Sequence, residues 1–333
     1  MEKPTVTVLA LGGTIAMTKG EGAGVVPNLT GENLVAAVPG LDEIARVEAR
    51  SFRQLPSAQL RYDDLEELAD AIRGLSGQGR RGIVVTQGTD TIEETAFALD
   101  RLLELDMPVV VTGAMRNPAL PGADGPANLL AAVQVAASEE ARGHGCLVVM
   151  NDEVHAARFV RKTHTSRPDA FSSPLSGRIG WLTEGRVCLG VRPGRVPALP
   201  FTPARTAAAP RVALATVALG DDGTFIRALA AAQPAGMVVE ATGGGHVASE
   251  VADALEEAAQ KMPVVLASRT GAGDVLARTY GFPGSEIDLQ RRGLVRGGWL
   301  DGLKAKVLLT LVLRHRLEDR RAVAEAFRPW GGG

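Results

Sequence analysis

Two threonine hydroxyls, Thr14 and Thr89, each lie in a glycine-rich string that directly follows a β-branched apolar run. The strings are Leu11-Gly-Gly-Thr-Ile-Ala16 and Gln87-Gly-Thr-Asp-Thr-Ile-Glu-Glu-Thr95, and the runs before them, 6–10 and 82–86, are predicted to be buried strands. Glycine permits a sharp turn and a close approach of a ligand to the backbone. Since ligands of open α/β sheets bind beyond the carboxyl ends of the strands, we expect both hydroxyls and the Asp90 carboxylate in one site suited to acyl chemistry.

A threonine hydroxyl becomes a useful nucleophile only with a base, an acidic group that orients the base, and amide donors for the oxyanion. Lys162, in the polar stretch 159–166, is the candidate base. It would complete a Thr-Lys-Asp relay, with the amides near Gly13 and Gly88 as oxyanion donors. Each feature alone also fits a blander interpretation: a structural or phosphate-binding turn, a helix cap, or a solvated lysine. The residues by themselves therefore predict a ligand-binding α/β protein, with hydrolase as one option.

The elements that must position these residues alternate along the first 190 residues. Apolar spacing predicts helices over 63–75, with Asp63 or Asp64 as the cap, 92–105 and 126–141, and further strands over 107–112 and 146–150. This alternation favours an α/β domain whose mostly parallel sheet carries helices on both faces.

The alternation stops in a proline-rich stretch and then resumes in a second, smaller α/β unit. We predict an N-terminal catalytic domain over 1–190, a linker over 191–210, and a C-terminal domain over 211–333. Strands of the second domain are predicted over 212–218, 236–240 and 263–267, and helices over 222–232, 248–261 and 303–317. The last four residues, 330–333, are predicted to form a disordered tail.

Composition excludes several classes of protein. The net charge of −2 favours neither nucleic acid nor an anionic membrane, and no apolar run reaches the ~20 residues that span a bilayer. The two cysteines form no metal or redox pattern, and the first residues show no signal-peptide pattern, so we expect a cytoplasmic protein. A dinucleotide-binding oxidoreductase is a weak alternative, because neither G-x-G-x-x-G nor a P-loop motif occurs. No CxxC or HExxH pattern predicts zinc, and His155 in Asp152-Glu-Val-His155 has weak ligand spacing.

Taken together, the strings resemble the bacterial-type L-asparaginase/glutaminase family. Gly12-Gly-Thr-Ile-Ala16 is similar to its first signature, and Gly88-Thr-Asp-Thr91 with Glu93-Glu-Thr95 is similar to its second. The order and spacing of further segments extend the similarity over nearly the whole chain: Thr112-Gly-Ala-Met-Arg116, Asp124-Gly-Pro-Ala-Asn128, Met150-Asn-Asp-Glu153, Arg161-Lys-Thr163 and Ser268-Arg269.

The resemblance implies a left-handed crossover in the larger domain, a homotetramer built as a pair of close dimers, and no cofactor or metal. It also implies deamidation of asparagine, or of glutamine or a related small amide, through a threonine acyl-enzyme that releases ammonia. Thr14 is then the nucleophile. Thr89, Asp90 and Lys162 form a second catalytic group that polarises the substrate or activates water.

The same resemblance implies a set of substrate contacts. Ser57 would hold the α-carboxylate of the substrate, while Gly13 and Gly88 would contact it through their backbones. Asp90 would bind the α-ammonium in a charge-assisted contact. Glu286 would be lent by the second domain of a neighbouring subunit, so that one subunit alone has an incomplete site.

The chain departs from the family around the substrate. Val25 aligns with a tyrosine that hydrogen-bonds the nucleophile from the glycine-rich lid 17–27; Tyr280 is the substitute we can propose, although it fits a packing role equally well. His246 stands where the family often has asparagine and joins the expected substrate contacts, Ala58 replaces a glutamine, and Gln87 a histidine. We therefore expect an intact catalytic set in an altered pocket. The alternative is a non-catalytic amino-acid-binding regulatory relative that has lost efficient activation of its nucleophile.

Overall fold

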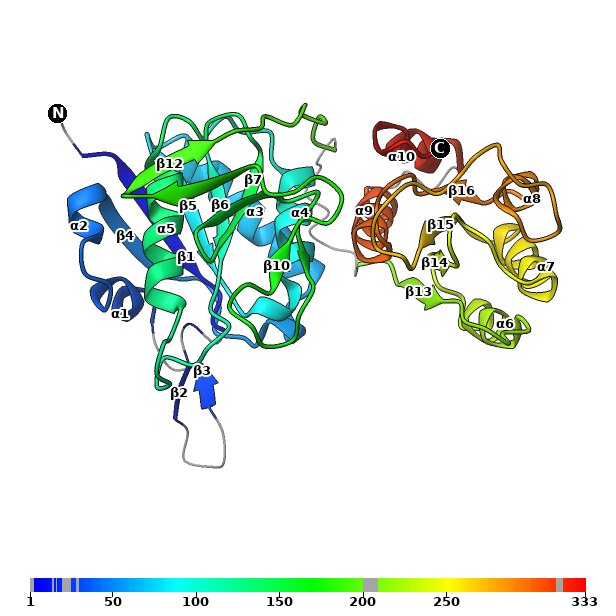
Figure 1. The fold of residues 1–333 in the computed structure, drawn as a ribbon, viewed down its shortest axis with the longest axis horizontal. Helices are drawn as coiled ribbons and strands as arrows, with labels where there is room; N and C mark the ends of the chain where they lie inside the picture. The colour runs from blue at the N-terminus through cyan, green and yellow to red at the C-terminus, as the bar shows by residue number, and fades with distance from the viewer. Residues whose placement is uncertain are drawn as a thin grey trace. The chain divides into compact units, whose positions relative to one another are not determined.

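The chain forms two compact units, Met1–Ala198 and Leu199–Gly333. The computed structural model describes residues 3–13, 15, 17–19, 25–27, 30–199, 209–315 and 320–333, with 17–19 and 25–27 described by their backbone alone. Figure 1 colours the first unit from blue to green and the second from green to red. The domain limit at residue 190 and the linker over 191–210 stay predictions, and residues 200–208 of that linker lie outside the described residues.

The larger unit is built on one eight-stranded sheet (Figure 1). In spatial order its strands are β12 (Arg186–Leu189), β11 (Gly180–Thr183), β8 (Glu153–Ala156), β7 (Cys146–Met150), β6 (Val109–Thr112), β5 (Gly82–Thr86), β1 (Thr5–Ala10) and β4 (Arg46–Ser51). The strands β4, β1, β5, β6 and β7 run parallel. The other three extend the sheet in antiparallel pairs. The predicted mostly parallel sheet is confirmed, with an antiparallel edge that the alternation did not indicate.

Helices cover both faces of this sheet, as predicted. The helices α1 (Gly31–Ala36), α2 (Leu41–Ile44) and α5 (Gly125–Ala137) pack on one face, and α4 (Ile92–Leu102), with α3 (Tyr62–Ser76) beside it, covers the other. The prediction that Asp63 or Asp64 is the N-cap of α3 is wrong, because Arg61 occupies that place. Asp64 still stabilises the start of the helix, since its Oδ2 accepts the backbone N–H of Arg61 at 2.9 Å from within the first turn.

Short elements at the rim of the unit carry the residues of interest. They are the hairpin of β2 (Met17–Lys19) and β3 (Val25–Pro27), the hairpin of β9 (Arg161–Lys162) and β10 (Phe171–Ser172), and the 3₁₀ turns η2 (Ser57–Gln59) and η3 (Thr89–Thr91). Residues 20–24 of the expected lid, between β2 and β3, lie outside the described residues.

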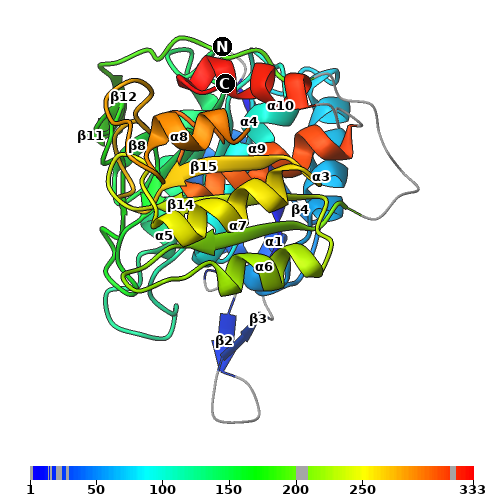
Figure 2. The same cartoon turned by 90° about the vertical axis from the view of Figure 1, so that its right-hand side faces the viewer.

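The smaller unit has a four-stranded parallel sheet. Its strands are β13 (Val212–Thr216), β14 (Gly236–Ala241), β15 (Val264–Ser268) and β16 (Val295–Arg296). Figure 2 shows α6 (Thr224–Ala231), α7 (Ser249–Ala259) and α8 (Glu286–Arg291) in front of this sheet and α9 (Gly302–Arg314) behind it, with α10 (Arg320–Phe327) packed on α9. Among the helices of the described ranges, none has the length and hydropathy that crossing a bilayer requires.

The end of the chain is ordered, so the prediction of a disordered tail is wrong. Trp330 is 1% exposed, and its ring packs edge-on against Trp299 with 5.2 Å between the ring centroids. The backbone N–H of Gly333 donates to the carbonyl of Arg296 at 3.0 Å. Burial of the large Trp330 side chain stabilises the segment. The three glycines beside it suggested disorder because glycine content alone does not show this packing.

Candidate active site

The two glycine-rich strings meet at the carboxyl edge of the larger sheet. β1 and β5 are parallel neighbours, so the residues after Ala10 and after Thr86 leave the sheet at the same edge. Gly13 has a φ of +86°, and a Cβ added there would lie 2.0 Å from the backbone nitrogen of Gly88. Only glycine allows this approach, and it brings the backbones of Gly13 and Gly88 into contact as the sequence predicts.

Ser57 joins the same place from the segment that follows β4. This segment runs along the end of β1, where the N–H of Leu55 donates to the carbonyl of Leu11 at 3.0 Å. A Cβ on Gly88 would lie 2.7 Å from Ser57 Oγ, so the two residues are in contact. Ser57 is 3% exposed, and its Oγ has no hydrogen-bond partner among the described residues. A buried hydroxyl in that position is suited to hold a polar group of a ligand.

Thr89, Asp90 and Lys162 form one hydrogen-bonded chain. The Nζ of Lys162 donates to Thr89 Oγ1 at 2.9 Å and to Asp90 Oδ1 at 2.7 Å. Thr89 is 6% exposed, the Lys162 side chain is 15% exposed, and that of Asp90 is 69% exposed. This hydrogen-bonded chain of side chains therefore leads from the buried hydroxyl of Thr89 through the mostly buried ammonium of Lys162 to the solvent-exposed carboxylate of Asp90. A lysine hydrogen-bonded to both a hydroxyl and an acid satisfies the geometric requirement for moving a proton to or from a reacting group.

The contact of Glu93 with this hydrogen-bonded chain of side chains was not predicted from the sequence. The carboxylate of Glu93 accepts the backbone N–H of Lys162 at 3.1 Å through Oε1. Glu93 belongs to the Glu93-Glu-Thr95 part of the second string, so its position in that string was the available signal. An acid in the first turn of a helix, however, is ordinary on its own.

The proposed nucleophile, Thr14, lies outside the described residues. Val25, at the place of the lid tyrosine, is described only by its backbone in β3. Gln87 is fully buried, and its Nε2 donates to Thr91 Oγ1 at 3.3 Å. Ala58, which follows Ser57 in η2, is exposed. The described side chains include no group of three or more histidines, cysteines or acids arranged to hold a metal ion.

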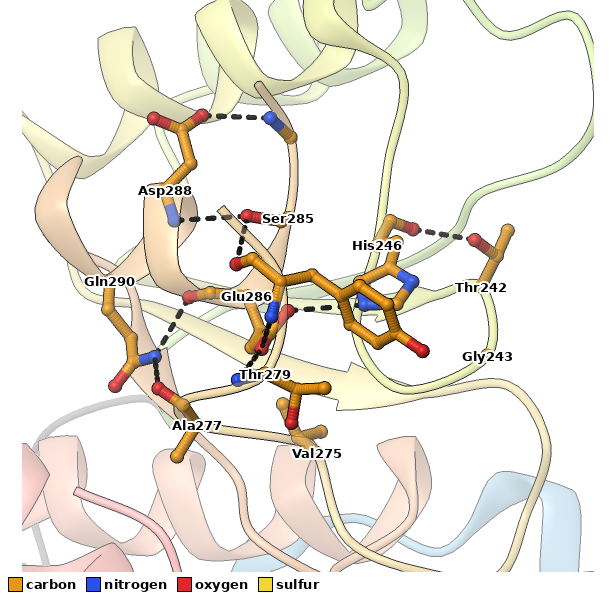
Figure 3. Close-up of polar contacts among 12 residues, drawn as sticks. Thr242, Gly243, His246, Val275, Ala277, Thr279, Ser285, Glu286, Asp288 and Gln290 are labelled. Carbon is orange, nitrogen blue, oxygen red and sulfur yellow. Dashed lines mark hydrogen bonds and ion pairs between the residues drawn. The ribbon is translucent and has the colours of Figure 1, made fainter. Parts of the chain in front are cut away.

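The residues predicted in the smaller unit form a separate cluster around Glu286 (Figure 3). Glu286 is 0% exposed, and its Oε1 accepts the backbone N–H groups of Thr279 and Tyr280, both at 2.7 Å. Its Oε2 lies 3.2 Å from His246 Nε2, which therefore carries the proton of that contact. Burial favours the neutral acid, but the two backbone donors and His246 outweigh it and hold the pKa of Glu286 below its ordinary value.

Within this cluster, the His246 side chain is 22% exposed, and the rings beside it reach further into solvent, Tyr280 at 44% and Phe282 at 45%. The Tyr280 ring packs edge-on against His246 at 4.9 Å between centroids, and Phe282 packs on both rings. The contact that Tyr280 makes to Glu286 uses its backbone N–H rather than its hydroxyl. Tyr280 therefore packs on its neighbouring rings but is not buried, and its role as a substitute for the lid tyrosine stays a prediction.

Comparison with known proteins covers both units. Residues 5–193 match the family described as Asparaginase, N-terminal, and residues 211–327 match the Glutaminase/Asparaginase C-terminal domain. The probable periplasmic L-asparaginase of Haemophilus influenzae is 34% identical over 97% of this chain and 92% of its own. L-asparaginase 2 of Escherichia coli is 35% identical over 98% and 93%.

A solved structure extends the similarity to the fold. The crystal structure of a probable cytoplasmic L-asparaginase from Campylobacter jejuni superposes with a TM-score of 0.89 at 31% identity, covering 98% of this chain and 99% of that one. Similarity of sequence and fold thus runs through both units and includes the strings that build the site. The chain belongs to the asparaginase family.

Proposed function

We propose that the protein is an amidohydrolase that converts L-asparagine and water to aspartate and ammonia, with glutamine or a related small amide as a further substrate. The observation that carries this proposal is the Thr89–Lys162–Asp90 chain beside Gly13, Gly88 and Ser57. The relatives named above are asparaginases, and they lend no support to the alternative of a non-catalytic binding protein.

The reaction proceeds in two steps. Thr14 Oγ attacks the carbonyl carbon of the side-chain amide, the C–N bond breaks, and the nitrogen leaves as ammonia with the proton that the hydroxyl gave up. Water then attacks the resulting ester, its proton returns to the oxygen of Thr14, and aspartate leaves. Thr89, Asp90 and Lys162 form a second group that polarises the substrate or activates the attacking water. The backbone amides near Gly13 and Gly88 stabilise the oxyanion.

The substrate is held through its α-carboxylate and α-ammonium. Ser57 Oγ, buried and without a described partner, receives the carboxylate, and the exposed carboxylate of Asp90 receives the ammonium. His246 and Glu286 of a neighbouring copy complete the contacts in a homotetramer arranged as a pair of close dimers. The protein acts in the cytoplasm, where Cys146 and Cys188 remain free thiols, and it needs neither metal nor cofactor.

The test is ammonia release from asparagine by the purified protein and three variants. Thr14→Ala should lose most of the activity, on the order of 10⁶-fold if Thr14 acts like the central member of a triad. Lys162→Met should lower kcat by ~10²–10⁴-fold because it removes a proton-transfer group. Ser57→Ala should instead raise KM, since Ser57 contacts a part of the substrate that does not react. Equal rates for the wild type and Thr14→Ala would refute the proposal, and asparagine binding by calorimetry without turnover would favour the binding protein.

A further inference from the structure

Lys162 lies in a very small piece of regular structure. Its strand β9 has two residues, and among the described strands it pairs with β10 alone, in a two-stranded sheet separate from the eight-stranded one. A two-stranded ribbon alone is only marginally stable in water. The position of the Lys162 ammonium therefore depends on what attaches this hairpin to the rest of the unit.

The backbone of Lys162 is attached through Glu93. Within the hairpin, the N–H of Thr163 donates to the carbonyl of Ala170 at 2.7 Å. Successive N–H groups of a strand point to opposite edges, so the N–H of Lys162 points away from β10 and needs another acceptor. Glu93 Oε1 supplies it at 3.1 Å, and the side chain that reaches across is itself 4% exposed.

Glu93 stands on the same short segment as the two partners of the lysine. Thr89 and Asp90 lie in η3, which runs directly into α4, and Glu93 is the second residue of that helix. α4 also packs against β9. One rigid segment thus holds Lys162 at two points: its ammonium through Thr89 and Asp90, and its backbone through Glu93.

We propose that Glu93 is a positioning residue that sets the place of the Lys162 ammonium for catalysis. This inference rests on the proposed function. Glu93 acts on the Lys162 ammonium through the backbone of Lys162. A displacement of a catalytic group by ~1 Å can lower a rate by ~10²-fold, and loss of one backbone attachment of a two-residue strand is sufficient for such a displacement.

A second attachment keeps the hairpin folded when Glu93 is removed. Ser173, directly after β10, contacts His155 Nδ1 of β8 at 2.9 Å through its Oγ, and both residues are buried. Phe171 of β10 is 4% exposed. Removing the Glu93 carboxylate should therefore shift Lys162 without unfolding the segment.

The experiment compares Glu93→Ala with Glu93→Gln and with a control on the same helix. Asp100, near the other end of α4, is also a buried carboxylate that accepts a backbone N–H, from Cys146 at 3.0 Å; its ion pairs are with Arg101 and Arg158 rather than with a residue of the hairpin. We expect Glu93→Ala to lower kcat ~10–100-fold with KM within twofold of the wild type, and Glu93→Gln, which keeps an oxygen acceptor, to recover most of the loss. Asp100→Ala should lower the thermal midpoint while its kcat stays within about threefold of the wild type.

Hydrogen exchange of the Lys162 amide gives a readout that does not require turnover. It should quicken markedly in Glu93→Ala and stay slow in Glu93→Gln and Asp100→Ala. Unchanged exchange in Glu93→Ala, or full kcat in that variant beside an active wild type, would overturn the positioning role. A wild type that releases no ammonia would instead refute the proposed function, and with it the catalytic consequence drawn for Glu93.

Discussion

Replacing Gly13 with alanine tests the contact on which the proposed site depends. The new Cβ would lie 2.0 Å from the nitrogen of Gly88 and 2.3 Å from its Cα, whereas real Cβ contacts begin at about 3.0 Å. The two backbones must therefore separate by at least 3.0 − 2.0 = 1.0 Å. A shift of that size between catalytic groups lowers the rate by ~10²-fold, which corresponds to ~2.7 kcal/mol of transition-state stabilisation.

Gly40 provides the matched control. Its φ of +83° is close to the +86° of Gly13, but a Cβ there would meet no atom within 4 Å. Gly40→Ala therefore carries only the backbone strain of a left-handed alanine, about 1–2 kcal/mol, and should lower the thermal midpoint by a few degrees with full activity. Gly13→Ala carries the same strain plus the clash.

The assay is kcat/KM for ammonia release, with thermal unfolding followed by circular dichroism for both variants. We expect Gly13→Ala to lose ~10²-fold in kcat/KM and to unfold at a lower temperature than Gly40→Ala. If Gly13→Ala matched Gly40→Ala in both measurements, the strings would not be in the close contact described here, and the reasoning about the oxyanion site would fail.

Three further predictions concern stability and reactivity. Burial lowers the pKa of His155 from 6.5 to about 4, so between those pH values the unfolded chain takes up a proton that the folded chain does not. About 3 kcal/mol of the free energy of unfolding should therefore be lost as the pH falls through this range. His155→Asn should remove this part of the pH dependence, measured by urea unfolding at pH 7 and pH 4.5. An unchanged slope in the variant would contradict the assignment. Trp330→Ala should reduce the stability of the smaller unit by ~3–5 kcal/mol, visible as a fall of roughly 10 °C in its thermal midpoint, whereas a change of less than about 2 °C would show that the end of the chain is not packed. Burial raises the pKa of the Cys146 thiol well above its usual value. Iodoacetamide at pH 8 should therefore label Cys188 in the folded protein and both thiols in urea. If the folded protein were labelled equally at Cys146 and Cys188, Cys146 would not be buried as described.

Four of the five parallel strands of the larger sheet could be predicted because they are continuous apolar runs, whereas the fifth, β4 (Arg46–Ser51), is mixed in polarity and was missed. Val109–Thr112 and Cys146–Met150 are completely buried, which leaves no polar alternation to confuse the pattern. The antiparallel extension was missed because its strands are short and mixed in polarity, as in Arg186–Leu189. Strands of this kind take their place from pairing with a neighbour, and single-sequence periodicity does not contain that information.

Those residues of the site that lie at strand ends or in the recognised glycine-rich strings could be predicted from the sequence. Thr89, Asp90 and Lys162 come together although 72 residues separate the acid from the lysine. The contact of Glu93 with the Lys162 backbone was not predictable from its type, since it depends on which edge of β9 faces α4. The contact of Glu286 with His246 was likewise not predictable from residue type, because it depends on the turn 242–246 that places His246 over the carboxylate.

The crowding around Gly88 also limits how the substrate preference of this protein can be redesigned. With Gly13 on one side and Ser57 Oγ on the other, a mutant library that varies these three positions would consist largely of inactive members. Ala58 follows Ser57 in η2 and is exposed, so we expect larger side chains to fit there without such a clash. Directed evolution toward a longer or differently charged amide should therefore begin by randomising that single position.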